Sequence, residues 1–424
     1  MLVYKLMAGL ALAFVVASPW VFAEPDYEDF RQDYGKEYQH YNRDFHSGFQ
    51  AYKDEYRKAL ADFKQELIEK WGYADVPSSS KYVVYSEEKD KKLIVDYSSG
   101  SLTVASITPA GNEELNRFLV EVLDQTVYEY QGHSVSLIQT LGLDQAIETD
   151  KYVAQLVQGS ESVQEAALVK ENIISLGIAV SAVERSVSVE GEKLSEQDEK
   201  YIRDLKNEER QASNKLLQLI QDPSSKQTQV KKIGLHASRW NRAKSYQHMV
   251  SDEAEIVGLD QALIYAIIEA ESNFNPQAVS PVPAFGMMQI VPMTAGVDVN
   301  EYLYRQKKPP RKEVLFNPAR NIKFGATYLY LLNNRYFKGV KNVESRLYCV
   351  IAAYNTGMGH VAQAFLGYGQ KNVAKALPFI NAMEPGEVKS KLLVDLPYDE
   401  TKAYLEKVLD GYAFYSSQLQ VVFR

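Results

Sequence analysis

The stretch that decides the fold of this chain runs from Ala266 to Ile290 and reads AIIEAESNFNPQAVSPVPAFGMMQI. Its first part predicts a helix, because apolar residues recur at three- and four-residue spacing up to Ala270. Asn275-Pro276 predicts the end of that helix, since a residue before proline avoids the α region. A loop with further prolines and a Gly-Met-Met-Gln turn follows. The stretch therefore predicts an apolar helix that ends in a polar site.

Glu271 stands at the end of the apolar run and faces the loop. Burial of a carboxyl group raises its pKa, and a carboxyl that stays protonated near neutral pH can act as a general acid. The alternative is a solvated or helix-capping glutamate, which spacing alone leaves open.

The motifs on either side of this acid are long and ordered. The string Glu271-Ser272-x-Phe274-Asn275-Pro276-x-Ala278-x-Ser280, followed by Gly286-Met287-Met288-Gln289, resembles the signature of the lytic murein transglycosylases of the soluble-lytic-transglycosylase type. The resemblance implies that Glu271 is the catalytic acid. It also implies substrate binding by Ser272, Ser280, Met288 and Gln289.

Two later motifs extend the resemblance to the rest of the C-terminal half. Ala353-Tyr354-Asn355, followed by Gly-Met-Gly, resembles the Ala-Tyr-Asn motif of the family. The segment from Pro397 to Tyr404 resembles its Pro-x-x-Glu-Thr-Arg-x-Tyr motif, with Lys402 in place of Arg. The resemblance implies that Tyr354, Asn355 and Tyr404 bind substrate. The alternative for the first of these motifs is a helix C-cap followed by glycine, and both interpretations can hold together.

The reaction follows from the resemblance and from the presence of one acid in these motifs. Glu269 is two residues from Glu271, roughly 200° around a helix, and therefore points away from it. The resemblance implies that Glu271 protonates the bond between N-acetylmuramic acid and N-acetylglucosamine in peptidoglycan glycan strands. A 1,6-anhydro ring then closes without water, metal or cofactor. A lysozyme-type hydrolase and a non-catalytic cell-wall scaffold remain as alternatives.

Composition and charge restrict the other function classes. The 424 residues are 46% hydrophobic and 24% charged, with a net charge of -8, so no general affinity for nucleic acid is expected. Cys349 is the single cysteine, which excludes an intramolecular disulfide or a cysteine cluster for a metal.

Residues 1–23 resemble a secretory signal peptide. Lys5 precedes an apolar run, and Val21-Phe22-Ala23 fits a cleavage site. We therefore expect a periplasmic protein. No cysteine lies near the cleavage site, so we do not expect a lipoprotein. The alternative is an uncleaved segment that anchors the chain in the membrane.

Residues 27–71 carry aromatic and leucine residues at every third or fourth position, from Tyr27 to Trp71. This spacing predicts one long amphipathic helix. The aromatic stripe either packs on the protein's own domain or self-associates. It could also bind sugars, a membrane or a partner of the cell-wall machinery.

The remaining N-terminal sequence predicts an α+β domain over residues 24–232. Segments at 81–85, 92–97 and 102–107 alternate as strands, with a turn at 98–100, and residues 112–220 are expected to be mostly helical. This order resembles the domain that precedes the catalytic module in some family members. For residues 233–424 the resemblance implies a helical, lysozyme-like catalytic domain. The predicted fold class is therefore mainly α (α+β).

Overall fold

The structure is a computed structural model. It describes residues 51–422 except 52, 108–110, 142–160, 163, 189–193, 223–227, 235–238 and 283. Residues 1–50 and 51–424 separate into two units, and the fold below concerns the second. The predicted signal peptide and the first half of the predicted aromatic helix lie outside the described residues.

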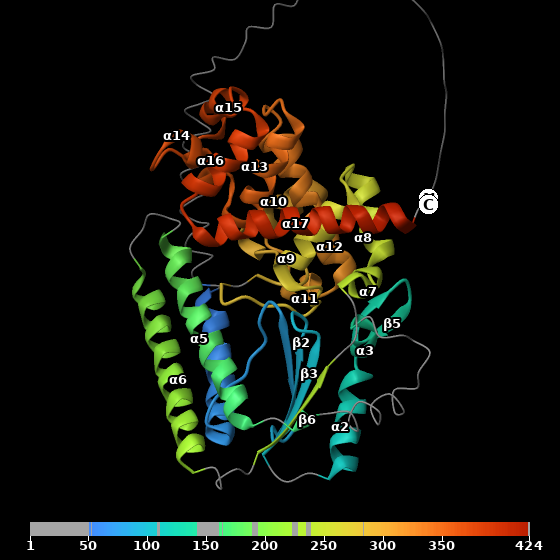
Figure 1. Ribbon diagram of the computed structural model, residues 1–424, viewed down its shortest axis with the longest axis vertical. Coiled ribbons are helices and arrows are strands. Elements are labelled where there is room, and N and C mark those ends of the chain that lie inside the picture. The colour runs from blue at the N-terminus through green and yellow to red at the C-terminus, as the bar shows by residue number, and fades with distance from the viewer. Residues whose placement is uncertain are drawn as a thin grey trace, which may run out of the picture. The chain divides into compact units, whose positions relative to one another are not determined.

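The N-terminal part of this unit is built around a five-stranded sheet of order β1-β2-β3-β7-β6, in which every pair is antiparallel (Figure 1). A helix over residues 53–71 precedes the sheet. The strands are β1 (Lys81–Tyr85), β2 (Lys91–Asp96), β3 (Ser101–Ser106), β6 (Glu161–Ser162) and β7 (Gln229–Gly234). The predicted strands in the 81–107 region and the turn between the last two are confirmed.

The sheet buries both of its faces, because successive side chains of a strand point to opposite sides. Leu93 and Val95 of β2 pack with α2 (Asn112–Leu123). Ile94, between them, packs on the other face with Trp71 and with α5 (Glu165–Ser188). The sheet is therefore the middle layer between helices.

Two long helices, α5 and α6 (Glu196–Gln221), pack against each other through an apolar seam. The stretch Glu165–Glu184 of α5 is long and apolar enough to cross a membrane, and a third of it is buried inside the protein. Helix 53–71 lies against α6, where Arg57 donates to Asp198 at 2.7 Å and Lys64 to Glu208 at 2.9 Å. In the described part of the aromatic stripe, Trp71 packs on the protein's own sheet.

The N-terminal part contains more β structure than the sequence predicted. β4 (Thr126–Tyr130) and β5 (His133–Ser136) form a separate hairpin inside the region expected to be mostly helical. β7 also pairs with β3, although its sequence QVKKIG gave no strand prediction. Both segments are short, so pairing with neighbouring strands rather than their own pattern determines their conformation.

The C-terminal part is helical and encloses the largest hydrophobic core of the described residues. Its helices are α7 (Arg239–Lys244), α8 (Gln247–Val257), α9 (Gln261–Ser272), α10 (Val297–Tyr304), α11 (Lys312–Leu315), α12 (Pro318–Leu331), α13 (Val343–Thr356), α14 (Met358–Leu366), α15 (Val373–Asn381), α16 (Pro385–Asp395) and α17 (Asp399–Val422). Two π-helical turns, η2 (Pro292–Gly296) and η3 (Leu332–Tyr336), complete it. Cys349 is buried in this core. The predicted fold class, mainly α with smaller β elements, is confirmed.

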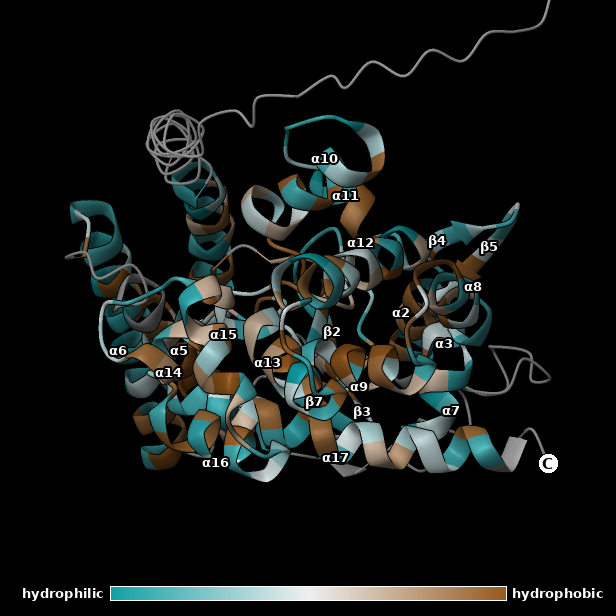
Figure 2. Cartoon of the chain, turned by 90° about the horizontal axis from the view of Figure 1, so that it is seen from above, coloured by the Kyte–Doolittle hydropathy of each residue, from teal (hydrophilic) through white to brown (hydrophobic). Residues whose placement is uncertain are grey.

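Helix α9 crosses the centre of this core and carries the predicted acid. Its ribbon is largely apolar (Figure 2), and residues 262–269 are all buried. It packs along α17, the last helix of the chain. One prediction for α9 was wrong in detail. The helix ends at Ser272 rather than at Asn275-Pro276, because Asn273 adopts the left-handed conformation with φ 52° and closes it.

Candidate active site

Glu271 lies in the last turn of α9. The helix begins after Asp260, whose side chain accepts a hydrogen bond from the backbone N–H of Ala262 at 2.9 Å. At the other end, Asn273 and Phe274 both have positive φ, and Phe274 is fully buried. The Phe274 ring is stacked on Tyr246 with 6.2 Å between centroids. The chain is thus turned sharply just after the acid and anchored by an aromatic side chain.

The carboxyl group of Glu271 is set up to hold a proton near neutral pH. Loss of water on burial raises its pKa to about 7, although Tyr404 and Lys407 both lower the pKa. Tyr404, from α17, donates its hydroxyl hydrogen to Oε1 of Glu271 at 2.7 Å. Lys407, one turn further along α17, donates to the carbonyl of Ala270 at 2.8 Å. Tyr404 of α17 therefore orients the carboxyl, and together with Lys407 it limits the rise of the pKa.

Glu269 is held away from this site, as its position on the helix predicted. It is buried and forms an ion pair with Arg239 of α7 through both carboxylate oxygens. The guanidinium group of Arg239 also lies over the ring of Phe414, at 4.2 Å from its centroid. Glu269 thus has a structural partner on another side of α9.

The segment of residues 276–290, which we call the acid loop, has little regular structure of its own. A buried side chain, Asn321 of α12, makes three hydrogen bonds to the region. It donates to the carbonyls of Phe285 and Leu315, each at 2.8 Å, and accepts from the N–H of Met288 at 2.7 Å. Sequence reasoning missed this role, because nothing in the sequence around Asn321 distinguishes it from a surface amide.

Gly286 fits against the same asparagine. Its φ is +74°, and a Cβ there would lie 2.1 Å from the carbonyl oxygen of Leu315 and 2.3 Å from Nδ2 of Asn321. Glycine is therefore required at this position for two reasons, the backbone conformation and the close approach of two buried polar atoms.

Two of the residues predicted to bind substrate hold the loop in place. Ser272 is fully buried and donates to the carbonyl of Met287 at 2.7 Å. Tyr354 of α13 donates to the carbonyl of Met288 at 2.8 Å. Met288 itself is buried, so it presents its backbone rather than its side chain to this network. Together these contacts connect α9, the acid loop and α13.

The other predicted residues lie in the same region. Gln289 has a φ of 47° and donates from its amide to the carbonyl of Gly286 at 2.9 Å. Asn355 accepts a hydrogen bond from Thr401 at 2.7 Å. Ser280 donates to the carbonyl of Val282 within the loop. Direct contact of any of these residues with substrate stays a prediction.

The N-terminal part of the compact unit contacts the acid loop. Asn275 donates from Nδ2 to the carbonyl of Ser79 at 3.2 Å, and the N–H of Val279 donates to the carbonyl of Ser78 at 3.3 Å. The rings of Tyr56 and Phe285 meet edge to face with centroids 6.1 Å apart. The asparagine of the predicted motif therefore joins the two parts of the chain rather than facing the acid.

Among the described residues, no group of three or more His, Cys, Asp and Glu side chains is arranged to hold a metal ion. Another carboxyl group with a raised pKa is Asp298 of α10, for which burial raises the value to about 6. Asp298 acts electrostatically on Tyr328, whose ring lies 5.6 Å from that of Tyr354. No motif or spacing in the sequence distinguishes Asp298 from a surface carboxyl.

Comparison with known families and proteins places the acid within a recognised domain. Residues 248–377 match the family described as Transglycosylase SLT domain. Membrane-bound lytic murein transglycosylase C of Serratia proteamaculans (strain 568) is 42% identical over 167 residues, which are 39% of this chain and 45% of that protein. The protein of the same name from Yersinia enterocolitica is 43% identical over 167 residues, which again are 39% of this chain and 45% of that protein. The chain thus spans about half the length of the curated relatives it matches.

Two solved structures also match in part. The lytic transglycosylase Slt of Pseudomonas aeruginosa is 24% identical, with a TM-score of 0.30, over 43% of this chain and 28% of that one. The 70 kDa soluble lytic transglycosylase of Escherichia coli is 25% identical, with a TM-score of 0.32, over 42% and 26%. The family resemblance predicted from the acid motif is confirmed by the matched domain and by the transglycosylase C relatives. That the N-terminal domain resembles the domain preceding the catalytic module in some family members stays a prediction.

Proposed function

We propose that this protein is a lytic transglycosylase that cleaves the glycan strands of peptidoglycan. The proposal combines the SLT match over residues 248–377 with the placement of Glu271 inside it. The main support for the proposal is the hydrogen bonding and the raised pKa of that carboxyl group. Glu271 is held by Tyr404 at 2.7 Å and has a pKa raised to about 7, which suits a general acid at neutral pH.

The proposed reaction uses this one carboxyl group twice. Glu271 donates its proton to the glycosidic oxygen between N-acetylmuramic acid and N-acetylglucosamine as the bond from that oxygen to C1 breaks. The acetamide group of the substrate stabilises the positive charge at C1. The ionised Glu271 then accepts the proton of the C6 hydroxyl, whose oxygen bonds to C1 and closes the 1,6-anhydro ring. The acid is regenerated and no water is consumed.

The engagement of Glu269 elsewhere supports this single-acid mechanism. Hydrolytic glycosidases generally use two carboxyl groups flanking the scissile bond. Glu269, the nearest carboxyl in sequence, is engaged with Arg239. The proposed enzyme therefore relies on the substrate for the second reacting group.

A lysozyme-type muramidase is the alternative that the structure allows us to test, through Asp298. Its pKa is raised to about 6, as expected for a partly desolvated carboxyl that could activate water. Replacing Asp298 by Asn would abolish activity in such a hydrolase. In the proposed transglycosylase we expect this variant to remain active within about tenfold, because no second carboxyl is used.

We propose that the enzyme acts in the cell envelope, where its transglycosylase C relatives are named as membrane-bound. We also propose that residues 1–23 direct export to the periplasm and that the C-terminal part has a lysozyme-like fold. For the 27–71 helix we propose a membrane or cell-wall partner.

The function is tested by release of soluble glycan fragments from purified peptidoglycan. We expect Glu271→Gln to lower the rate by about 1,000-fold, since the amide cannot donate a proton to the leaving oxygen. The control is Glu269→Gln, on the same helix two residues away, which we expect to retain activity in its folded fraction. Equal losses in both variants, with both folded, would contradict the assignment of the acid.

A further inference from the structure

An apolar cavity in the N-terminal part has a lining that does not include Glu271. It encloses about 90 Å³. Because a cavity needs about 10–15 Å³ for each water molecule, it has room for a group the size of a leucine side chain. Its walls come from helix 53–71, segment 74–78, β1, β2, α5 and α6. Ser280 and Pro281 of the acid loop also line it.

The lining of this cavity is mostly apolar. One row of α5 faces it at positions 168, 172, 175, 176 and 179, the spacing of one helix face. The apolar side chains that complete the wall are Tyr56, Leu60, Val76, Pro77, Val83, Ile94, Tyr201 and Leu205. An occupant is therefore expected to be mainly apolar.

Asn172, in the middle of this row, presents an unused acceptor. The residue is 6% exposed, and its Oδ1 atom is buried without a hydrogen-bond partner in the described part of the chain. The orientation of the amide is fixed, because Nδ2 donates to the carbonyl of Ala74 at 2.7 Å and to Oδ1 of Asp75 at 3.2 Å. A flipped amide would place an oxygen against both acceptors. The unpartnered atom is thus an acceptor, and it calls for an N–H or O–H donor.

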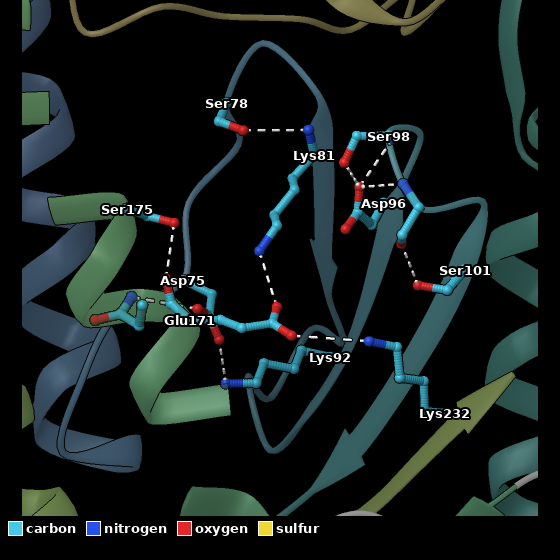
Figure 3. Close-up of polar contacts among 12 residues, drawn as sticks. Asp75, Ser78, Lys81, Lys92, Asp96, Ser98, Ser101, Glu171, Ser175 and Lys232 are labelled. Carbon is cyan, nitrogen blue, oxygen red and sulfur yellow. Dashed lines mark hydrogen bonds and ion pairs between the residues drawn. The ribbon is translucent and has the colours of Figure 1, made fainter. Parts of the chain in front are cut away.

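The charged residues of the lining are already paired. Figure 3 shows Lys81 of β1 and Lys232 of β7 directed at Glu171 of α5, at 2.9 and 3.7 Å. Asp75 meets Lys92 at 2.7 Å. Lys64, the remaining charged residue of the lining, meets Glu208. Because each charge has a partner of opposite sign, the cavity favours a neutral occupant over an ionic head group.

We propose that this cavity, the Asn172 cavity, is a binding site for a peptide segment that inserts an apolar side chain and donates a backbone N–H to Oδ1 of Asn172. In a peptide, the backbone N–H that would bind Oδ1 of Asn172 and the apolar side chain that would fill the cavity lie one residue apart. A phospholipid would bring a charged head group to a rim without a free charge. The occupant would also touch Ser280 and Pro281, in the same loop whose Val279 is bonded to Ser78 of the cavity wall.

The test uses the full chain and the neutral probe N-acetyl-leucine amide, with binding followed by saturation-transfer NMR. We expect the probe to bind, and Ala179→Leu to weaken binding at least tenfold, because Ala179 lines the cavity and the larger side chain fills it. The control is Gly177→Ala on the same helix, where an added Cβ meets no atom within 4 Å. This control is expected to bind as wild type does.

Three results would overturn the proposal. The probe could fail to bind the wild-type chain, or it could bind Ala179→Leu unchanged. A short-chain phosphatidylcholine could displace the probe and bind more tightly, which would assign the cavity to an acyl chain. Binding does not depend on catalysis, so Glu271→Gln is expected to bind the probe normally.

Discussion

The acid loop and the N-terminal sheet hold their backbones in different ways. In the sheet, the backbone N–H and C=O groups of neighbouring strands bind one another along continuous ladders, as in the six paired positions of β2 and β3. The acid loop has only isolated backbone pairs, such as Phe285 with Ile290, and single side chains add to them: Asn321, Ser272 and Tyr354 each bind loop carbonyl or N–H groups. The comparison teaches that the geometry near Glu271 depends on a few individual residues, whereas the sheet depends on many equivalent contacts.

The largest expected effect is on the free energy of unfolding, and it is expected at Gly286, whose surroundings are crowded. We expect Gly286→Ala to destabilise the fold by about 4 kcal/mol, because the new Cβ collides with a backbone oxygen and a buried amide. Gly132→Ala, in the N-terminal hairpin, has a similar φ of +81° but no atom within 4 Å, and should cost about 1 kcal/mol. Denaturant unfolding of both variants measures the difference. A similar loss of stability in the two variants would contradict the proposed difference between the acid loop and the N-terminal part.

The pH dependence of stability should have opposite signs in the two regions. Burial raises the pKa of Glu271 to about 7 from an ordinary value of 4.5. Both folded and unfolded forms are protonated below pH 4.5, so the associated loss of stability develops between pH 4.5 and 7 and reaches about 3 kcal/mol. Glu271→Gln should therefore equal wild type at pH 4 and exceed it by about this amount at pH 8.

Asp198 provides the matched carboxyl in the N-terminal part. Burial alone would raise the pKa of Asp198, but hydrogen bonds from Ser195 and Arg57 outweigh it and lower the pKa. Its contribution to stability is therefore present at neutral pH and is lost as the pH falls through that lowered value. Asp198→Asn should be destabilised at pH 7 and approach wild type in acid. The same pH trend in both variants would contradict the assigned environments.

A smaller effect is expected from the hydroxyl that binds the acid. Tyr404→Phe removes the hydrogen bond that lowers the pKa of Glu271, so the alkaline limb of the activity profile should move to higher pH. The rate at its optimum should fall about tenfold, which corresponds to one hydrogen bond to a charged group. Tyr412→Phe, on the same helix but bonded to Asp260, should leave the profile unchanged. A rate loss without a shift would mean that Tyr404 acts in substrate binding.

The smallest effect tests the contact between the two parts. Tyr56→Leu removes the edge-to-face contact with Phe285 while keeping an apolar side chain. We expect a twofold to fivefold loss of activity, because an aromatic pair contributes about 0.5–1 kcal/mol and the loop keeps its other anchors. Phe63→Leu, on the same helix and partly exposed, is the control. Equal activity in both variants would show that the N-terminal helix does not steady the acid loop.

The sequence predicted those features that depend on local pattern or on a long motif. The strands of the 81–107 region follow from alternation, and the position of Glu271 at the end of α9 follows from helical spacing. The roles of Asn321 and Ser272 could not be predicted, because their partners are irregular loop atoms that only the folded chain brings near. β7 was missed for a related reason: a short, lysine-rich segment is a strand here because β3 pairs with it.

The most direct test of the central claim, that Glu271 acts alone with the substrate's own hydroxyl, is the chemistry of the products. Wild-type protein is incubated with purified peptidoglycan in water labelled with heavy oxygen, and the released fragments are analysed by mass spectrometry. We predict 1,6-anhydro fragments without label. Reducing-end fragments that carry one labelled oxygen would contradict this account, because they would show that water is the nucleophile.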